Sequence, residues 1–428
     1  MPIKEKLINI TNNKSLLNGA MFSGFSFINR GFSFLLLLIL ANYITPAEYG
    51  YLSLFSTVVM VVSYFMAMST EGYMSVAFFK EGEEGIKNTF SCILATSLIS
   101  LIIFGLIIAI GGDKLASLLD LPQNVLFLSI AISFFTVFTN VNLDYIRLRE
   151  KVKTYGIYSC GNALLNFVLS IILIKTFLLG WEGRVYAQTL CYVLFGVIGL
   201  ITFIGGGYLR LPDKVYWKKM LIWGIPLIPH LATTFIRQGC DRYIINYYHS
   251  ITDVGLFSFA LTLANIITMI GSGFNQSNSV DIYKILGDKN LSDQKKFVRT
   301  NAQIKLFTKV YIYITILITV VGYVLFPLIF PKYSSAMNYF AILAVYGFLV
   351  CIYLVYTNYL FFYDETKTLM YITFGSSVLH LILSVLLTRH SLYITAGIYG
   401  ITQLLVVMFV RWKALRLIER NLNNKLNV

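Results

Sequence analysis

The chain alternates long apolar runs with short polar connections. We place twelve runs, near residues 18–44, 50–79, 88–110, 123–146, 155–177, 184–206, 219–241, 252–279, 306–330, 336–362, 368–388 and 393–410. A helix needs about 20 predominantly apolar residues to cross a bilayer, whereas a transmembrane barrel would show alternating segments of about 10 residues. The pattern therefore predicts an all-α integral membrane protein with about twelve transmembrane helices.

Composition and charge support this interpretation. Hydrophobic residues make up 57% of the chain and charged residues 13%, and the mean hydropathy is +0.72, which leaves too little polar surface for a soluble protein of this length. With a cytoplasmic N-terminus, 26 of the 34 Lys and Arg residues lie on the cytoplasmic side and six on the opposite side. The positive-inside rule then places both termini in the cytoplasm. The net charge of +14 is explained by topology, and we expect no nucleic-acid partner.

The two halves of the chain share a spacing pattern. At an offset of 205, Tyr43, Glu48 and Gly50 match Tyr248, Asp253 and Gly255; at an offset of 214, Lys153, Thr154, Gly161, Leu165, Ser170 and Gly183 match Lys367, Thr368, Gly375, Leu379, Ser384 and Gly397. We predict two six-helix lobes, 1–209 and 220–428, joined by a basic cytoplasmic linker at 210–219. Because each repeat has an even number of helices, the lobes should be related by an axis along the membrane normal.

Two arginines lie inside apolar runs. Arg30 is near the middle of the first run and Arg237 is in the seventh, at nearly equivalent positions of the two halves. A cation at the centre of a membrane helix costs roughly 2.5–3.5 kcal/mol on insertion scales and usually faces a bundle interior or an aqueous cavity. Guanidinium groups stay charged and bind phosphate in a bidentate manner. We expect both arginines to line one central cavity and to bind an anionic group there.

The seventh run also contains Pro226, Pro229, His230 and Asp241. Two prolines three residues apart remove amide donors and favour a kink, so we predict a hinge at Pro226 and Pro229. Asp241 follows Arg237 by four residues, a spacing that places both on one helical face, and it either neutralises that arginine or takes part in coupling. His230 is either a hydrogen-bonded interior histidine or a proton relay.

Other polar residues are weaker candidates. Glu71 lies about twenty residues into the second run and either pairs with an arginine, carries a coupling proton or ends the helix at the cytoplasmic interface. Asn275, Gln276 and Asn278, with the neighbouring serines, end the eighth run with uncharged hydrogen-bonding groups and could contact sugar.

The sequence contains no G-x-x-x-x-G-K-[ST] loop, no metal-ligand cluster and no nucleophile constellation. We therefore predict a transporter without a bound cofactor or metal and not an enzyme. Active transport would draw on a proton or sodium gradient or on the membrane potential. A sugar-polymerising membrane enzyme remains an alternative, although the outward loops are short.

The pattern resembles a known family. Gly24-x5-Arg30 followed by Tyr-Ile-Thr-Pro-Ala-Glu-Tyr-Gly at 43–50, in a chain of two six-helix halves, is similar to the polysaccharide transporters of the multidrug/oligosaccharidyl-lipid/polysaccharide (MOP) exporter superfamily, and most to Wzx-type O-antigen repeat-unit flippases. The resemblance implies a V-shaped bundle like that of the multidrug MATE transporters, located in the bacterial cytoplasmic (inner) membrane.

The same resemblance implies a function. The substrate would be an undecaprenyl-pyrophosphate-linked oligosaccharide, moved between leaflets by alternating access during synthesis of O-antigen, lipopolysaccharide or another surface polysaccharide. Membrane lipids, a polysaccharide polymerase and chain-length machinery would be its partners. An ion-coupled multidrug antiporter of the same superfamily is the alternative, but drug exporters tend to carry a carboxylate in the first helix, where this chain has Arg30.

Overall fold

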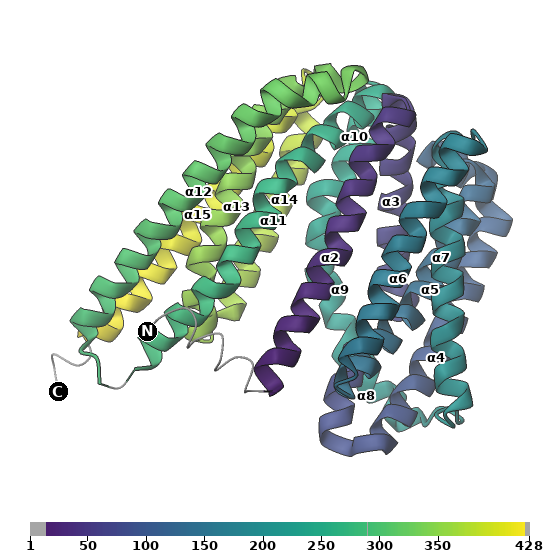
Figure 1. Ribbon diagram of the computed structural model, residues 1–428, viewed down its shortest axis with the longest axis horizontal. Helices are drawn as coiled ribbons and strands as arrows, with labels where there is room; N and C mark the ends of the chain where they lie inside the picture. The colour runs from purple at the N-terminus through teal and green to yellow at the C-terminus, as the bar shows by residue number, and fades with distance from the viewer. Residues whose placement is uncertain (1–13, 289, 424–428) are drawn as a thin grey trace. The chain divides into compact units, whose positions relative to one another are not determined.

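The computed structural model describes residues 14–288 and 290–423. The α-helices are α2 (Lys14–Tyr43), α3 (Pro46–Met66), α4 (Tyr73–Leu119), α5 (Gln123–Leu148), α6 (Val152–Ile171), α7 (Gly180–Gly205), α8 (Lys214–Gly224), α9 (Ile228–Thr234), α10 (Cys240–Tyr248), α11 (Ile251–Gly287), α12 (Asp293–Ile329), α13 (Met337–Phe362), α14 (Thr366–Leu387) and α15 (Leu392–Asn423) (Figure 1). Short 3-10 or π segments are η1 (Ile172–Thr176), η2 (Ile225–Leu227), η3 (Phe235–Gly239) and η4 (Pro331–Ala336).

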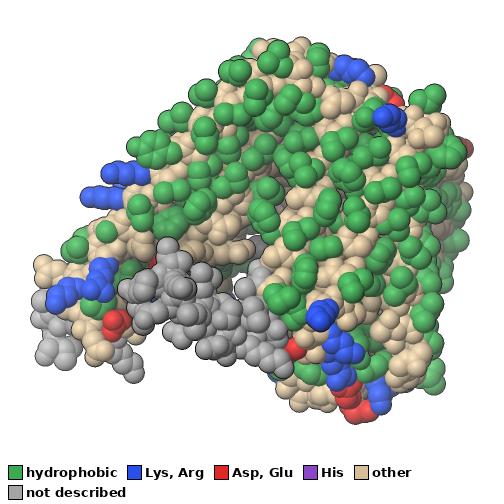
Figure 2. All heavy atoms as spheres, in the orientation of Figure 1, with side chains coloured by type: hydrophobic (Ala, Val, Ile, Leu, Met, Phe, Trp, Pro, Cys, Tyr) green, Lys and Arg blue, Asp and Glu red, His purple; other side chains and the backbone are tan. Residues whose placement is uncertain are grey.

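Most of these helices have the composition of membrane spans. Among the described residues, eleven helical segments are long and apolar enough to cross a bilayer, and α2 contains a shorter apolar stretch, Phe27–Tyr43. Hydrophobic side chains cover most of the helical surface visible in Figure 2, as expected for helices in contact with lipid. The predicted all-α membrane fold is confirmed.

The second apolar run is not one helix, as the sequence had indicated. Helix α3 ends at Met66, a turn follows with positive φ at Met68 and Ser69, and α4 begins at Tyr73. Helix α4 then bends sharply at Gly82, where φ is 63° and ψ is −137°. This backbone region is accessible mainly to glycine, so Gly82 permits the turn between the second and third spans.

The chain divides into two compact units, residues 1–232 and 233–428. In the first unit, α2 packs on α6, α3 on α5, α4 on α5, α5 on α7, and α6 on α7. In the second, η3 and α10 pack on α14, α11 on α13, α12 on α13, α13 on α15, and α14 on α15. These are the same pairings, in the same order along the chain, as the predicted repeat requires.

The matched turns of the two repeats are also built alike. Thr45 caps α3, with its hydroxyl accepting from the Glu48 amide at 3.3 Å and the Glu48 carboxylate accepting from the Thr45 amide at 2.8 Å. Ser250 caps α11 in the equivalent place, accepting from the Asp253 amide at 3.2 Å. Such caps satisfy the free amides of a first helical turn. The 205-residue offset therefore corresponds to one capping motif used twice.

The boundary between the units lies after the predicted linker, inside α9. Segment 210–219 is attached to the first unit: Arg210 Nη2 lies 2.6 Å from Glu84 Oε2, Lys219 Nζ lies 3.2 Å from Glu81 Oε1, and Trp217 Nε1 donates to Thr96 Oγ1 at 2.8 Å. These contacts hold 210–219 as part of the first unit. The six-helix boundaries 1–209 and 220–428 stay a prediction.

Candidate functional site

Arg237 is bound by uncharged side chains in the second unit. It lies in η3, inside the span formed by Lys214–Tyr248. Its Nη1 donates to Gln403 Oε1 at 2.9 Å, and its Nη2 donates to Thr402 Oγ1 at 3.4 Å, both on α15. The guanidinium also lies 5.9 Å from the centre of the Tyr346 ring on α13. None of these partners is an acid, so they orient the guanidinium without neutralising it.

Asp241 pairs with a histidine. Its Oδ2 lies 2.8 Å from His380 Nε2 on α14, and the side chains are 1% and 0% exposed, respectively. On the other side of the ring, His380 Nδ1 lies 3.1 Å from Thr402 Oγ1. The Tyr399 ring meets the imidazole edge to face at 4.7 Å between centroids. Thr402 thus contacts both Arg237 and His380, and the two polar groups form one cluster within the second unit.

Of the two alternatives for Asp241, neutralisation of Arg237 is not found among the described contacts, and the helix geometry gives the reason. Residues Phe235–Gly239 form a π-helical turn. A π turn contains an extra residue, so side chains four apart are no longer stacked as they are in an α-helix. Arg237 consequently points to α15, whereas Asp241 meets α14.

His380, Thr402 and Gln403 were not singled out from the sequence. A single histidine in an apolar run does not indicate which residue it contacts, and the partner of His380, Asp241, is 139 positions away in the chain. The repeat offers one signal: the offset of 214 places His380 opposite Asn166 and Ser384 opposite Ser170.

The equivalent position in the first unit is also polar. Asn166 and Ser170 on α6 both bind Arg184 on α7, with Arg184 Nη1 donating to Asn166 Oδ1 and, at 3.1 Å, to Ser170 Oγ. Arg184 lies in the second turn of α7. The fifth helix of each repeat therefore carries a polar side chain that bonds to a charged residue. In the first unit Asn166 bonds to Arg184, and in the second unit His380 bonds to Asp241.

Two of the predicted residues have side chains outside the described part of the structure. Arg30 lies in α2 and His230 in α9, but their side-chain positions are not described. Next to Arg30, Asn29 Nδ2 donates to Ser159 Oγ at 2.9 Å and ties α2 to α6. The roles predicted for Arg30 and His230 stay predictions.

The amide cluster of the eighth span lies in the middle of α11, which continues to Gly287. Asn275 Oδ1 accepts from Asn358 Nδ2 on α13 at 2.9 Å and from Asn278 Nδ2 at 3.5 Å. Asn278 is fully buried, whereas Gln276 is exposed. The three predicted sugar contacts therefore differ in exposure, and Asn275 joins α11 to α13.

Glu71 lies in the turn between α3 and α4 and not within a helix. Burial raises the pKa of its carboxyl, its own backbone amide lowers that pKa, and nearby Asp144 raises it again. Of the predicted hinge prolines, Pro226 is in the 3-10 segment η2, whereas Pro229 is the second residue of the short α-helix α9.

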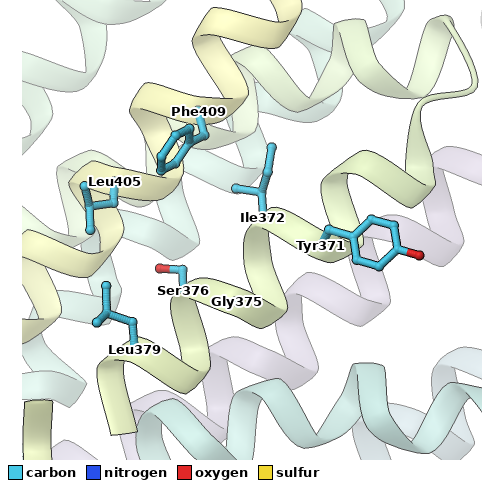
Figure 3. A pocket seen from close by; sticks show the side chains of 7 residues that line it. All are labelled: Tyr371, Ile372, Gly375, Ser376, Leu379, Leu405 and Phe409. Atoms are coloured by element: carbon cyan, nitrogen blue, oxygen red, sulfur yellow. The ribbon is translucent and has the colours of Figure 1, made fainter. Parts of the chain in front are cut away.

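An apolar hollow of about 320 Å³ lies on the surface of α14 and α15 (Figure 3). It is lined by Tyr371, Ile372, Gly375, Ser376, Leu379, Leu405 and Phe409. The Ser376 hydroxyl is already bonded to the Thr402 carbonyl at 2.9 Å. Apart from the Tyr371 hydroxyl, the remaining lining is apolar and suits hydrocarbon.

Comparison with known proteins identifies the family. Residues 15–279 match the family of polysaccharide biosynthesis proteins. The chain belongs to this family. The chain is 24% identical to the Lsg locus putative protein 1 of Haemophilus influenzae over 385 residues, which are 88% of this chain and 92% of that protein. It is 22% identical to an uncharacterized membrane protein of the same organism, over 91% and 94% of the two chains.

Solved structures establish the fold of this family member. An inward-facing multidrug resistance transporter of the MATE family, in the MOP superfamily, superposes with a TM-score of 0.69 at 16% identity, over 90% of this chain and 95% of that one. An outward-facing MATE transporter of the MOP superfamily gives a TM-score of 0.60 at 15% identity, over 94% and 95%. The predicted MATE-like fold is confirmed. The protein is a multi-pass membrane protein of the polysaccharide biosynthesis family.

Proposed function

We propose that this polysaccharide biosynthesis protein is a flippase. It moves an undecaprenyl-pyrophosphate-linked oligosaccharide from the inner to the outer leaflet of the bacterial cytoplasmic membrane, with both termini in the cytoplasm. Arg237 binds the pyrophosphate, together with Arg30 on the first helix of the other repeat. The lipid chain stays in the bilayer, and the product serves O-antigen or another surface polysaccharide.

The observation that carries the proposal is the bonding of Arg237. Gln403 and Thr402 orient its guanidinium without cancelling its charge, and Asp241, the carboxylate closest to it in sequence, is bonded to His380. Because a cation in a membrane span is energetically costly to insert, Arg237 is expected to have a functional partner. Phosphate oxygens match the planar donors of arginine.

Irregular helix on both sides of the unit boundary supports alternating access. The 3-10 segment Ile225–Leu227 precedes Ala232 and the π segment Phe235–Gly239 follows it. Such segments lack the regular hydrogen-bond ladder of an α-helix and often mark hinges. The proposal assigns the change between inward and outward access to this stretch.

The test uses purified protein in liposomes that contain a fluorescent lipid-linked oligosaccharide with a pyrophosphate bridge. Translocation is measured as protection of the sugar from an external glycosidase. We expect wild-type protein to translocate the lipid, Arg237→Ala to lose most of the activity, and Arg237→Lys to retain part of it because Lys keeps the charge but not the bidentate geometry. The matched control is Arg389→Ala, because Arg389 is an exposed arginine that bonds only to its neighbour His390 among the hydrogen bonds of the described residues.

Complementation of a deletion strain addresses the alternatives. Wild-type protein should restore surface polysaccharide, and well-expressed Arg237→Ala and Arg30→Ala variants should not. A deletion that leaves the surface glycan intact but changes tolerance to cationic dyes would refute the flippase proposal in favour of drug antiport. Product formation by the purified protein alone would favour a polymerising enzyme.

A further inference from the structure

An apolar groove on the paired helices α14 and α15 leads toward two exposed cations at one end of both spans. We propose that this surface binds one anionic phospholipid, with an acyl chain in the groove and the phosphate bound by Lys367 and Arg416. The proposal is independent of the flippase function, because it concerns a lipid of the surrounding bilayer and not the transported one.

The acyl-chain site is the hollow of about 320 Å³ between α14 and α15. Ile372 and Leu379 line it on α14, and Leu405 and Phe409 line it on α15 (Figure 3). A second hollow of about 250 Å³ shares both α15 residues with the first and extends along that helix to Trp412. The two adjoining hollows, together called the α14–α15 groove, offer an almost wholly apolar surface, as a hydrocarbon chain requires.

The groove has about the length of one bilayer leaflet. On α14 it extends from Tyr371 to Leu379, which at a rise of 1.5 Å per residue is about 12 Å. The hydrocarbon core of a bilayer is about 30 Å thick, so each leaflet contributes about 15 Å. A phospholipid acyl chain fills one leaflet, whereas a long polyprenyl chain would extend well beyond this groove. The length therefore favours a phospholipid as the occupant.

Each helix carries a cation on the face that lines the groove, one helical turn nearer to the helix end. On α14, Lys367 precedes Tyr371 by four residues, and on α15, Arg416 follows Trp412 by four. Residues four apart on an α-helix are neighbours on one face. The contact is direct for α15, where the Arg416 guanidinium lies 3.9 Å from the centre of the Trp412 ring.

These two cations are left without an acidic partner. Glu365, the residue before α14, pairs with Lys413 of α15 at 2.8 Å and joins the two helix ends. Within the described part of the chain, no salt bridge includes Lys367 or Arg416. Basic sites between membrane helices bind the phosphates of anionic lipids. The Lys and Arg distribution predicts that this end is cytoplasmic, so the lipid belongs to the inner leaflet.

The test is fluorescence quenching of Trp412 in nanodiscs of phosphatidylcholine. The chain has four tryptophans, and replacement of Trp181, Trp217 and Trp223 by Phe leaves Trp412 as the reporter. A minor fraction of the lipid is phosphatidylglycerol or phosphatidylcholine with brominated acyl chains, which quench tryptophan on contact. We expect brominated phosphatidylglycerol to quench several-fold more strongly at the same fraction. If the triple replacement does not fold, native mass spectrometry of the unaltered chain compares retention of the same two lipids.

Two single-charge variants separate a site from general attraction to a basic surface. Arg416→Gln should weaken the preference for phosphatidylglycerol about fivefold, the effect of one cation near a membrane surface. Arg411→Gln is the matched control and should keep the preference. Arg411 is also exposed and precedes Trp412 by one residue, but it lies near Tyr356 on α13. Each variant is compared with its own fluorescence in unbrominated lipid.

A third variant fills the groove without disturbing the fold. Gly375 lines the hollow, and a Cβ at this position would meet nothing within 4 Å. Gly375→Leu should therefore fold normally, place its side chain in the hollow and abolish most of the preference for phosphatidylglycerol.

Three outcomes would overturn the proposal. Equal quenching by the two brominated lipids in the wild-type groove would mean ordinary contact with the bilayer. Equal losses in Arg416→Gln and Arg411→Gln would mean a diffuse attraction to the basic end of the helices. Relief of quenching by undecaprenyl phosphate, but not by excess unbrominated phosphatidylglycerol, would assign the groove to the transported lipid.

Discussion

Removal of one member of the Asp241–His380 pair should strongly destabilise the second unit. His380→Leu fills a similar volume but leaves the buried Asp241 carboxylate without the donor now 2.8 Å away. Breaking a buried pair in this way costs about 3–5 kcal/mol. At about 2–4 °C per kcal/mol for a domain of this size, the melting temperature should fall by about 6–20 °C.

The double variant Asp241→Asn/His380→Leu should be more stable than His380→Leu alone. Asp241→Asn by itself keeps an acceptor for Nε2 and exchanges a charge-assisted bond for a neutral one, at a cost of about 1 kcal/mol. In the double variant the buried group is an unpaired amide, which costs about 1–3 kcal/mol and not the cost of a lone charge. His380→Gln, which keeps a donor, is the conservative control.

The assay should report the second unit alone. Cys240 and Cys351 lie in that unit. With Cys92, Cys160 and Cys191 replaced by Ser, the reaction of a thiol-activated dye during heating follows the exposure of these two thiols. Wild-type stability in His380→Leu, or strictly additive losses in the double variant, would refute the energetic coupling of the two side chains.

Three further predictions concern the first unit. Gly199→Ala should destabilise it by about 1–3 kcal/mol, because the new methyl would lie 2.5 Å from the Phe138 carbonyl oxygen, whereas Gly205→Ala on the same helix meets nothing within 4 Å and should be neutral in thermal unfolding. Thr45→Ala should lower stability by about 1 kcal/mol through loss of the α3 cap, and an unchanged melting temperature would contradict the role of the capping motif. Glu71→Gln should be more stable than wild type at pH 8 but not at pH 5, since a raised carboxyl pKa means that the folded state loses stability as pH rises; a gap that does not depend on pH would contradict this assignment.

Much of the fold was predictable because it depends on periodic or summed properties. The apolar runs predict the spans, the Lys and Arg distribution predicts topology, and the 205-residue offset corresponds to equivalent capped turns at Thr45 and Ser250. Helix ends were less predictable. The turn after Met66 and the extension of α11 past Ser279 occur where apolar and polar residues mix and the run length alone is uninformative.

The candidate site was only partly predictable, since its pairs are formed by packing. Arg237 was identified because a cation in an apolar run is costly. Its partners Thr402 and Gln403 are far away in the chain, and the π turn that separates Arg237 from Asp241 leaves no clear mark in the sequence. For the same reason His380, which has no charged neighbour on α14, was found only from the contact.

The equivalence of Asn166 and His380 bears on how such a protein can evolve. Each residue occupies the same place in the fifth helix of its repeat, and the helix pairings around it are the same in both units. After duplication of an ancestral half, one copy could therefore exchange an amide for an imidazole without a change of scaffold. In the two-fold repeat, the same packing position therefore holds an amide that binds a cation in one unit and an imidazole that binds a carboxylate in the other.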